Sequence, residues 1–289
     1  MRRFLRWARN VLLALVAIVL VAYGVIYFLS QRTLRHAYGE PLVSLTIPSD
    51  SASLAEGKRL AQLRGCSGGC HGHEIEGETF LDDPLLARIV APNLTEAVRR
   101  YSDADLGRII RRGVRPDSHS VVVMPAEMFS VLADADLAKI IAYLRSVPRM
   151  PGPLPEVRLG PLARLGIVLK QYEPAVALVH RADSLTPTYP RPGDVTAPGA
   201  YLARSSCTEC HGVGLTGAHV GDQTSPDLKI VAGYSSDAFT KLMRTGKGLG
   251  DRELGIMSEV ARDRFSHFTD AEIAALRGYL LARAQGGGT

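Results

Sequence analysis

Two short clusters of cysteine and histidine, one in each half of the chain, constrain the fold most. The first reads Cys-Ser-Gly-Gly-Cys-His over residues 66–71, and the second reads Cys-Thr-Glu-Cys-His over residues 207–211. The segments after the clusters also match: Tyr101 corresponds to Tyr234, and Phe129 corresponds to Phe265. Two tandem copies of one domain explain this repeat better than a single large fold does.

Each copy has the periodicity of α-helices. Ser102 and Asp105 form a capping-box pattern before apolar residues at helical spacing, and Thr269 and Glu272 form the same pattern in the later copy. No comparable run alternates with a period of two, so strands are at most a minor part of the chain. The sequence therefore predicts an all-α protein.

The segment between the copies is rich in proline. Residues 148–200 contain ten prolines, together with a short apolar stretch at residues 165–169. Such a composition is typical of a linker that partly drapes over its neighbouring domains. We predict four regions: a cytoplasmic tip and transmembrane anchor at 1–36, a first domain at 37–147, the linker at 148–197 and a second domain at 198–289.

The N-terminal region contains an uninterrupted apolar run. Val11 to Leu29 is 19 residues long and has no charged side chain; as a helix it would span roughly 28 Å, which suffices to cross a bilayer. A removable signal peptide is the alternative, but its apolar stretch is shorter and the end of this run is a poor cleavage site. Four arginines precede the run and two follow it, which predicts a cytoplasmic N-terminus. We expect a single-pass protein of a bacterial inner membrane with its domains in the periplasm.

The net charge of +5 belongs to this N-terminal region. Residues 1–36 hold six arginines and no acidic residue. The remaining residues carry 28 basic and 29 acidic side chains, a balance of −1. A basic patch for nucleic acid is therefore not indicated, and we expect no nucleic-acid partner.

The second cluster has the spacing C-x-x-C-H, which is the attachment motif for c-type haem. At this spacing the thiols of Cys207 and Cys210 reach the two vinyl groups of the porphyrin, and His211 becomes the proximal iron ligand. A thioredoxin-like redox pair would need a βαβ context, which the sequence does not show. A structural zinc site would need its cysteine pairs much closer together in the chain.

The first cluster has three residues between its cysteines instead of two. Two of these three are glycines, whose backbone freedom allows an extra residue to bulge. Because the cluster occupies the same place in the repeat, we predict that Cys66 and Cys70 bind a second haem c with His71 as its proximal ligand. The alternative is a degenerate copy whose cysteines form a disulfide.

A c-type haem usually takes a second axial ligand, often methionine. Met124 lies five residues before Phe129, and Met257 lies eight before Phe265, so both occupy similar places in the repeat. We predict them as the axial ligands. Met128 is a rival to Met124 and is more typical of a packing residue.

These features resemble the class I cytochrome c family, in particular the multihaem cytochrome subunits that accompany periplasmic quinoprotein and flavoprotein dehydrogenases. The resemblance covers residues 51–150 and 198–289 and includes Pro-Asn-Leu at 92–94 and Pro-Asp-Leu at 226–228. It implies that the carbonyl of Pro92 orients His71 and that of Pro226 orients His211. Two departures matter: those subunits typically have three haems, and the first cluster here carries an inserted residue.

These observations favour an electron-transfer protein without substrate turnover of its own. It would exchange electrons with redox-protein donors and acceptors, alone or as a subunit of a dehydrogenase or oxidase complex. The alternative is a dihaem peroxidase or another haem oxidoreductase with one reactive haem, which would require one iron to lose its distal ligand. A third interpretation is an anchored, disulfide-stabilised adaptor.

Overall fold

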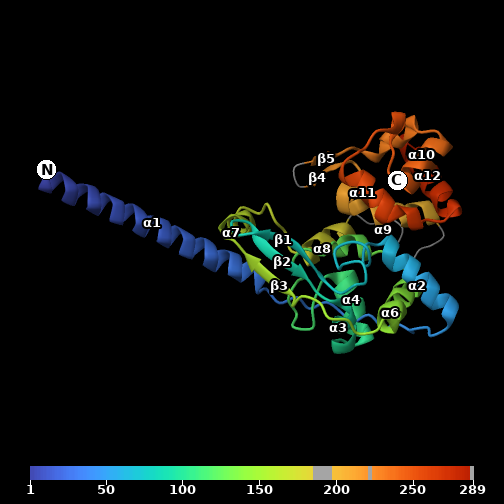
Figure 1. Cartoon of the computed structure of the whole chain (residues 1–289), viewed down its shortest axis with the longest axis horizontal. Coiled ribbons are helices and arrows are strands. Elements are labelled where there is room, and N and C mark those ends of the chain that lie inside the picture. Colours follow the sequence, from blue (N-terminus) through green and yellow to red (C-terminus); the bar gives the residue numbers. More distant parts are fainter. Residues whose placement is uncertain (185–196, 221–222, 287–289) are drawn as a thin grey trace.

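The computed structural model describes residues 1–184, 197–220 and 223–286. A long helix, α1 (Arg2–Leu34), projects from two helical units that lie beside one another (Figure 1). The first unit contains the helices α2 (Ser51–Leu63), α3 (Leu94–Arg100), α4 (Asp103–Arg112), α5 (Ala126–Phe129) and α6 (Asp134–Ser146). The second contains α9 (Pro198–His211), η1 (Leu228–Gly233), α10 (Ser236–Thr245), η2 (Leu249–Asp251), α11 (Ile256–Asp263), η3 (Phe265–His267) and α12 (Asp270–Ala284).

Helix α1 contains the apolar run of the sequence and leaves almost all of it exposed. By length and composition it is the one helix of the described residues that could cross a membrane. Its first turns carry Trp7, and its last turns carry Tyr23 and Tyr27. The helix ends at Leu34, where the chain enters the first unit.

In the first unit, the first helix crosses the last helix very closely. Helix α2 packs along α6, and Leu60, Leu137 and Ile141 are among the side chains buried around this contact. Gly57 lies at the crossing, where an added Cβ would come within 2.0 Å of the carbonyl oxygen of Lys139. Only a residue without a side chain therefore permits this approach.

The second unit repeats this crossing with α9 and α12. Gly199 takes the place of Gly57, because a Cβ added there would lie 2.2 Å from the carbonyl oxygen of Ala275. Helix α12 begins with the capping box predicted from the sequence: Thr269 and Glu272 each bond the backbone N–H of the other. The prediction of a mainly helical chain with a repeated domain is confirmed.

Strands form a small part of the described structure. Strands β1 (Glu78–Asp83), β2 (Ala87–Ala91) and β3 (Glu156–Leu159) form an antiparallel sheet in the order β1-β2-β3, with an irregularity between Thr79 and Leu81. Strands β4 (Ala218–Val220) and β5 (Gln223–Ser225) form a short hairpin in the second unit. Helical periodicity alone did not reveal the sheet, because each strand is only three to six residues long.

The proline-rich segment is structured along much of its length. Strand β3 pairs with β2. Helix α7 (Pro161–Val168), which follows β3 in the chain, packs on the end of α1, and α8 (Ala175–Ser184) packs on α5. Ala175, Val176 and Val179 of α8 are buried. This part of the predicted linker therefore adds a layer to the first unit, while residues 185–196 lie outside the described residues.

The glycine at the helix crossing gives a direct stability prediction. Gly57→Ala should lower the free energy of unfolding by about 2 kcal/mol or more, because its methyl group would collide with the backbone of α6. The measurement is guanidinium unfolding of the full chain, followed by circular dichroism. Gly278→Ala is the matched control: its Cβ meets nothing within 4 Å, so it should be neutral or stabilise α12 by up to about 1 kcal/mol. Equal effects at both positions would contradict the close crossing.

Candidate haem attachment sites

The second cluster lies entirely within the last turns of α9, which ends at His211. Cys207, Cys210 and His211 stand at positions i, i+3 and i+4, so they share one face of the helix. Cys207 and His211 are buried and Cys210 is half-buried. The helix alone therefore places both thiols beside the imidazole.

The first cluster reaches a similar arrangement through a turn. Helix α2 ends at Leu63, and Gly65 and Gly68 adopt φ values of +74° and +71°, in the left-handed region that favours glycine. The loop closes on itself through a hydrogen bond from the Gly68 N–H to the Gly72 carbonyl, 3.1 Å long. The turn accommodates the third residue between Cys66 and Cys70.

The two histidines have the same hydrogen bond. Nδ1 of His71 lies 2.8 Å from the carbonyl oxygen of Pro92, and Nδ1 of His211 lies 2.8 Å from that of Pro226. A carbonyl only accepts, so each Nδ1 carries the proton and donates it. Burial lowers the pKa of both imidazoles, against the opposing effect of these hydrogen bonds. Each ring is therefore neutral near pH 7, with the lone pair of Nε2 available to a metal.

All four cysteines lie in the described part of the chain, and all are free thiols. Burial raises the pKa of Cys66 and Cys210 to about 11 each and that of Cys207 to about 12. Burial likewise raises the pKa of Cys70. The thiols are therefore protonated near pH 7.

The donor set at each cluster fits haem c. Each cluster offers two thiols for the vinyl groups and one neutral imidazole for the iron, which is too few ligands for a closed tetrahedral zinc site. A cavity of about 270 Å³ also adjoins Cys70. Within the described residues, no group of three or more His, Cys, Asp or Glu side chains could share a metal ion.

Both predicted axial methionines are half-buried and pack against the main core. Met124 precedes α5 and also touches the smaller cluster formed by Ala126, Ala175 and Val179. Met257 lies in the first turn of α11. Met128, the rival of Met124, is 1% exposed within the core, as expected of a packing residue. The axial roles of Met124 and Met257 stay predictions.

A half-buried arginine that sequence reasoning missed lies between the two clusters. The guanidinium of Arg264 bonds Oε2 of Glu209, inside the second cluster, at 2.7 Å. It also lies against Gly65 of the first cluster, where an added Cβ would come within 2.5 Å of it, and it lines the cavity beside Cys70. Arg264 thus touches both attachment regions at once.

Further polar contacts join the two units around Arg264. Arg59 of α2 bonds Glu272 at 2.8 Å and the carbonyl oxygen of His267 at 2.9 Å. Arg64, only 2% exposed, donates to Oγ of Ser206. These pairs are more than one hundred residues apart in the chain, so no local sequence pattern could have shown them.

The comparisons with known proteins agree with this geometry. The family model for cytochrome c matches residues 54–148 and 196–283, which is more than half of the chain. The chain belongs to the cytochrome c family. Membership implies haem c as the cofactor, and the two matched regions correspond to the two helical units. The predicted family is therefore confirmed.

Among curated relatives, the chain is similar to cytochrome subunits of dehydrogenases. It is 23% identical over 268 residues to the fructose dehydrogenase cytochrome subunit of Gluconobacter japonicus, covering 82% of this chain and 54% of the relative. It is 24% identical over 273 residues to the cytochrome c subunit of alcohol dehydrogenase (quinone) of Gluconacetobacter polyoxogenes, covering 81% of this chain and 57% of the relative. The chain thus spans a little over half the length of these relatives.

The Arg59–Glu272 pair should couple the two cytochrome c domains, because Arg59 belongs to the first domain and Glu272 to the second. In a double-mutant cycle with Arg59→Ala and Glu272→Ala, we expect a coupling of about 1 kcal/mol in the free energy of unfolding, because the two side chains are 23% and 22% exposed. The control pair is Arg262–Glu253, whose side chains are 43% and 53% exposed; its coupling should stay below about 0.5 kcal/mol. A coupling at Arg59 no larger than the control's would contradict a role in joining the domains.

A buried carboxyl group near this interface predicts a pH dependence. Glu127 lies on α5, which packs on α9, and its Oε2 makes no hydrogen bond within the described residues. Burial, assisted by the charge of Glu209, raises its pKa. The folded state therefore binds a proton at the Glu127 carboxyl group more tightly than the unfolded state does. At pH 7 the raised pKa lowers the free energy of unfolding. Below about pH 4, the ordinary range of a glutamate pKa, this loss of stability is absent because the group is protonated in both states.

Glu127→Gln should therefore raise the melting temperature at pH 7, and the gain should vanish as the pH falls below about 4. The measurement is thermal unfolding at several pH values. Glu259→Gln, an exposed position on α11, is the control and should change stability little at either pH. A gain that does not depend on pH would refute the explanation.

Proposed function

We propose that the chain is a membrane-anchored electron-transfer protein that carries two haem c groups and serves as the cytochrome subunit of a periplasmic dehydrogenase complex. The observation that carries this proposal is the repeated geometry of the clusters. In each domain, two thiols lie in the same short segment as a histidine whose Nδ1 is bound to a proline carbonyl. Two such sites lie in adjacent domains of one chain.

Each site presents two thiols and one imidazole held by a hydrogen bond. Cys66 and Cys70 would hold one haem, and Cys207 and Cys210 the other, through thioether bonds. The proline carbonyls keep the proton of His71 and His211 on Nδ1 and leave Nε2 for the iron. Met124 and Met257 would supply the second protein ligand of each iron. When bound, haem c supplies a one-electron couple at its iron.

The interface supports electron exchange between the two sites. Arg264 touches the first attachment loop and bonds the second attachment helix, so the two clusters are held at one shared boundary. Arg59 and Arg64 add further bonds across the same boundary. A relay with both sites in one chain needs such a fixed arrangement.

Helix α1 supports the anchor. Trp7 and Tyr27 stand twenty residues apart, about 30 Å along a helix, which matches the thickness of the hydrocarbon core between two aromatic belts. The arginines before the apolar run would remain in the cytoplasm. The two domains would then lie on the periplasmic side.

The names of the relatives support a dehydrogenase subunit as a redox partner. They are named as cytochrome subunits of fructose dehydrogenase and of alcohol dehydrogenase (quinone). We therefore propose a dehydrogenase subunit as the electron donor, with a second redox component of the membrane as acceptor.

The decisive experiment is a pyridine haemochrome assay on the full chain, expressed with a cytochrome c maturation system. We expect two haems per chain, falling to one in Cys66→Ala/Cys70→Ala and to one in Cys207→Ala/Cys210→Ala. A single haem in the wild type would restrict the proposal to one domain, and no haem would end it.

The same preparation tests the axial ligands. Met124→Ala and Met257→Ala should each remove part of the sulfur-to-iron absorption band of the oxidised protein, whereas Met243→Ala, a buried core residue of α10, should leave the band intact. If one haem of the wild type lacks this band and binds cyanide readily, the electron-transfer proposal is wrong. The protein is then better explained as a haem oxidoreductase with one reactive haem.

A further inference from the structure

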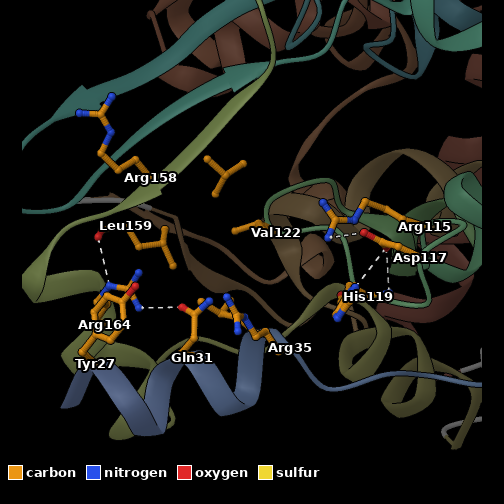
Figure 2. A pocket seen from close by; sticks show the side chains of 13 residues that line it. Tyr27, Gln31, Arg35, Arg115, Asp117, His119, Val122, Arg158, Leu159 and Arg164 are labelled. Atoms are coloured by element: carbon orange, nitrogen blue, oxygen red, sulfur yellow. Dashed lines mark hydrogen bonds and ion pairs between the residues drawn. The ribbon is translucent and has the colours of Figure 1, made fainter. Parts of the chain in front are cut away.

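A cavity lies where α1 meets the first domain, away from both haem attachment sites. Its volume is about 410 Å³, and its walls come from the last turns of α1, the loop at residues 115–122, strand β3 and helix α7 (Figure 2). The lining carries four arginines and a single carboxylate. The four are Arg35, Arg115, Arg158 and Arg164, and the carboxylate is that of Asp117.

The positive charge of this cavity is only partly balanced. Arg115 pairs with Asp117 at 3.3 Å, and Arg158 pairs with Glu156. Glu156 also pairs with Arg88, so it is shared between two cations. His119 faces the same space and lies 3.3 Å from Asp117.

The remaining two arginines have no carboxylate partner within the described residues. Arg164 donates to neutral oxygens only, namely Oγ of Ser30 at 3.0 Å, Oε1 of Gln31 at 3.2 Å and the carbonyl of Leu159 at 3.3 Å. The exposed side chain of Arg35 makes no hydrogen bond or ion pair with any described residue. Both rise from the side of the cavity next to α1 (Figure 2). The cavity thus offers unneutralised guanidinium groups.

If α1 is the proposed membrane anchor, the position of the cavity along α1 indicates how deep the cavity lies in the membrane. The guanidinium of Arg164 lies 4.1 Å from the centre of the Tyr27 ring, and tyrosines at the end of an apolar span typically lie at the level of the lipid headgroups. Arg35 follows two turns later, just past the end of α1. The cavity therefore opens at headgroup depth.

An exposed apolar surface lies at the same level. Leu162, Leu165 and Leu169 follow the spacing i, i+3, i+7 along and just past α7, and they are 50%, 36% and 57% exposed. The turn between β1 and β2 is bonded to the start of α7 and exposes Leu85 and Leu86. Leucines in this pattern suit a helix that rests on a membrane surface. They favour a ligand that combines an anionic head with acyl chains.

We propose that this cavity binds the phosphate-bearing headgroup of an anionic phospholipid from the leaflet that faces the haem domains. Arg35 and Arg164 would bind the phosphate oxygens, since guanidinium groups match phosphate geometry with two parallel hydrogen bonds. The acyl chains would run along the apolar surface formed by Leu162, Leu165 and Leu169. The bound lipid would hold the first domain at a defined orientation to the membrane. This inference rests on the proposed anchor.

The test is native mass spectrometry of the full-length holoprotein, released from detergent and titrated with phosphatidylglycerol or phosphatidylcholine. We expect the wild type to retain one phosphatidylglycerol in preference to phosphatidylcholine. Arg35→Gln/Arg164→Gln should weaken that retention by about tenfold or more, since each arginine near an anionic lipid contributes several-fold to binding. Arg3→Gln/Arg9→Gln removes the same charge at the other end of α1 and should retain the lipid as the wild type does.

Equal retention by the two double variants would overturn the headgroup site, as would equal binding of the two lipids. Release of the lipid by millimolar inorganic phosphate, with phosphate then bound at the same site, would assign the cavity to a free anion instead. The intact mass of the protein and its presence in the membrane fraction test the anchor separately. A chain cleaved after the apolar run would end both the proposed anchor and the proposed lipid site. The haem content should be unchanged in every variant, so failure of the lipid site leaves the electron-transfer proposal standing.

Discussion

The contact on which each domain depends is the crossing of its first and last helices at a glycine. In α2 and α6, and again in α9 and α12, the backbones approach so closely that a single methyl group would collide with a carbonyl oxygen. The attachment cluster follows α2 directly in one domain and ends α9 in the other. The crossing therefore fixes where the thiols and the imidazole emerge from the core. Interiors packed this densely transmit even a small displacement, so the geometry of each site depends on its glycine.

The two domains reach one chemical arrangement by different local structures. In the second domain, helical spacing alone puts the thiols and the histidine on one face. In the first, left-handed glycines fold an extra residue into a turn. In both, the proline carbonyl holds the histidine with the proton on Nδ1. The hydrogen bond to the histidine is thus the shared element, and the spacing of the cysteines is the variable one.

Arginine side chains make polar contacts between the domains and also line the cavity at α1. Arg264 joins the two attachment regions, and Arg164 joins α7 to the end of α1. A guanidinium presents several donors in a rigid plane, so one side chain can bond two elements at once. The chain thereby places two cytochrome c domains against each other and sets the first of them beside the apolar helix. Both arrangements matter for the proposed function, in which electrons pass between two haems beside a membrane.

The sequence by itself determined the family, the predominantly helical fold, the repeated domain, the two cysteine-histidine clusters and the apolar N-terminal helix. Each depends on residues a few positions apart: the spacing of Cys207, Cys210 and His211, or the capping box of Thr269 and Glu272. The tertiary structure decided the three-stranded sheet, the packing of α7 and α8, the place of Arg264 and the arginine-lined cavity. These features join segments that lie tens to hundreds of residues apart, and such contacts arise only from how whole domains pack. A local sequence pattern therefore gives no information about that packing.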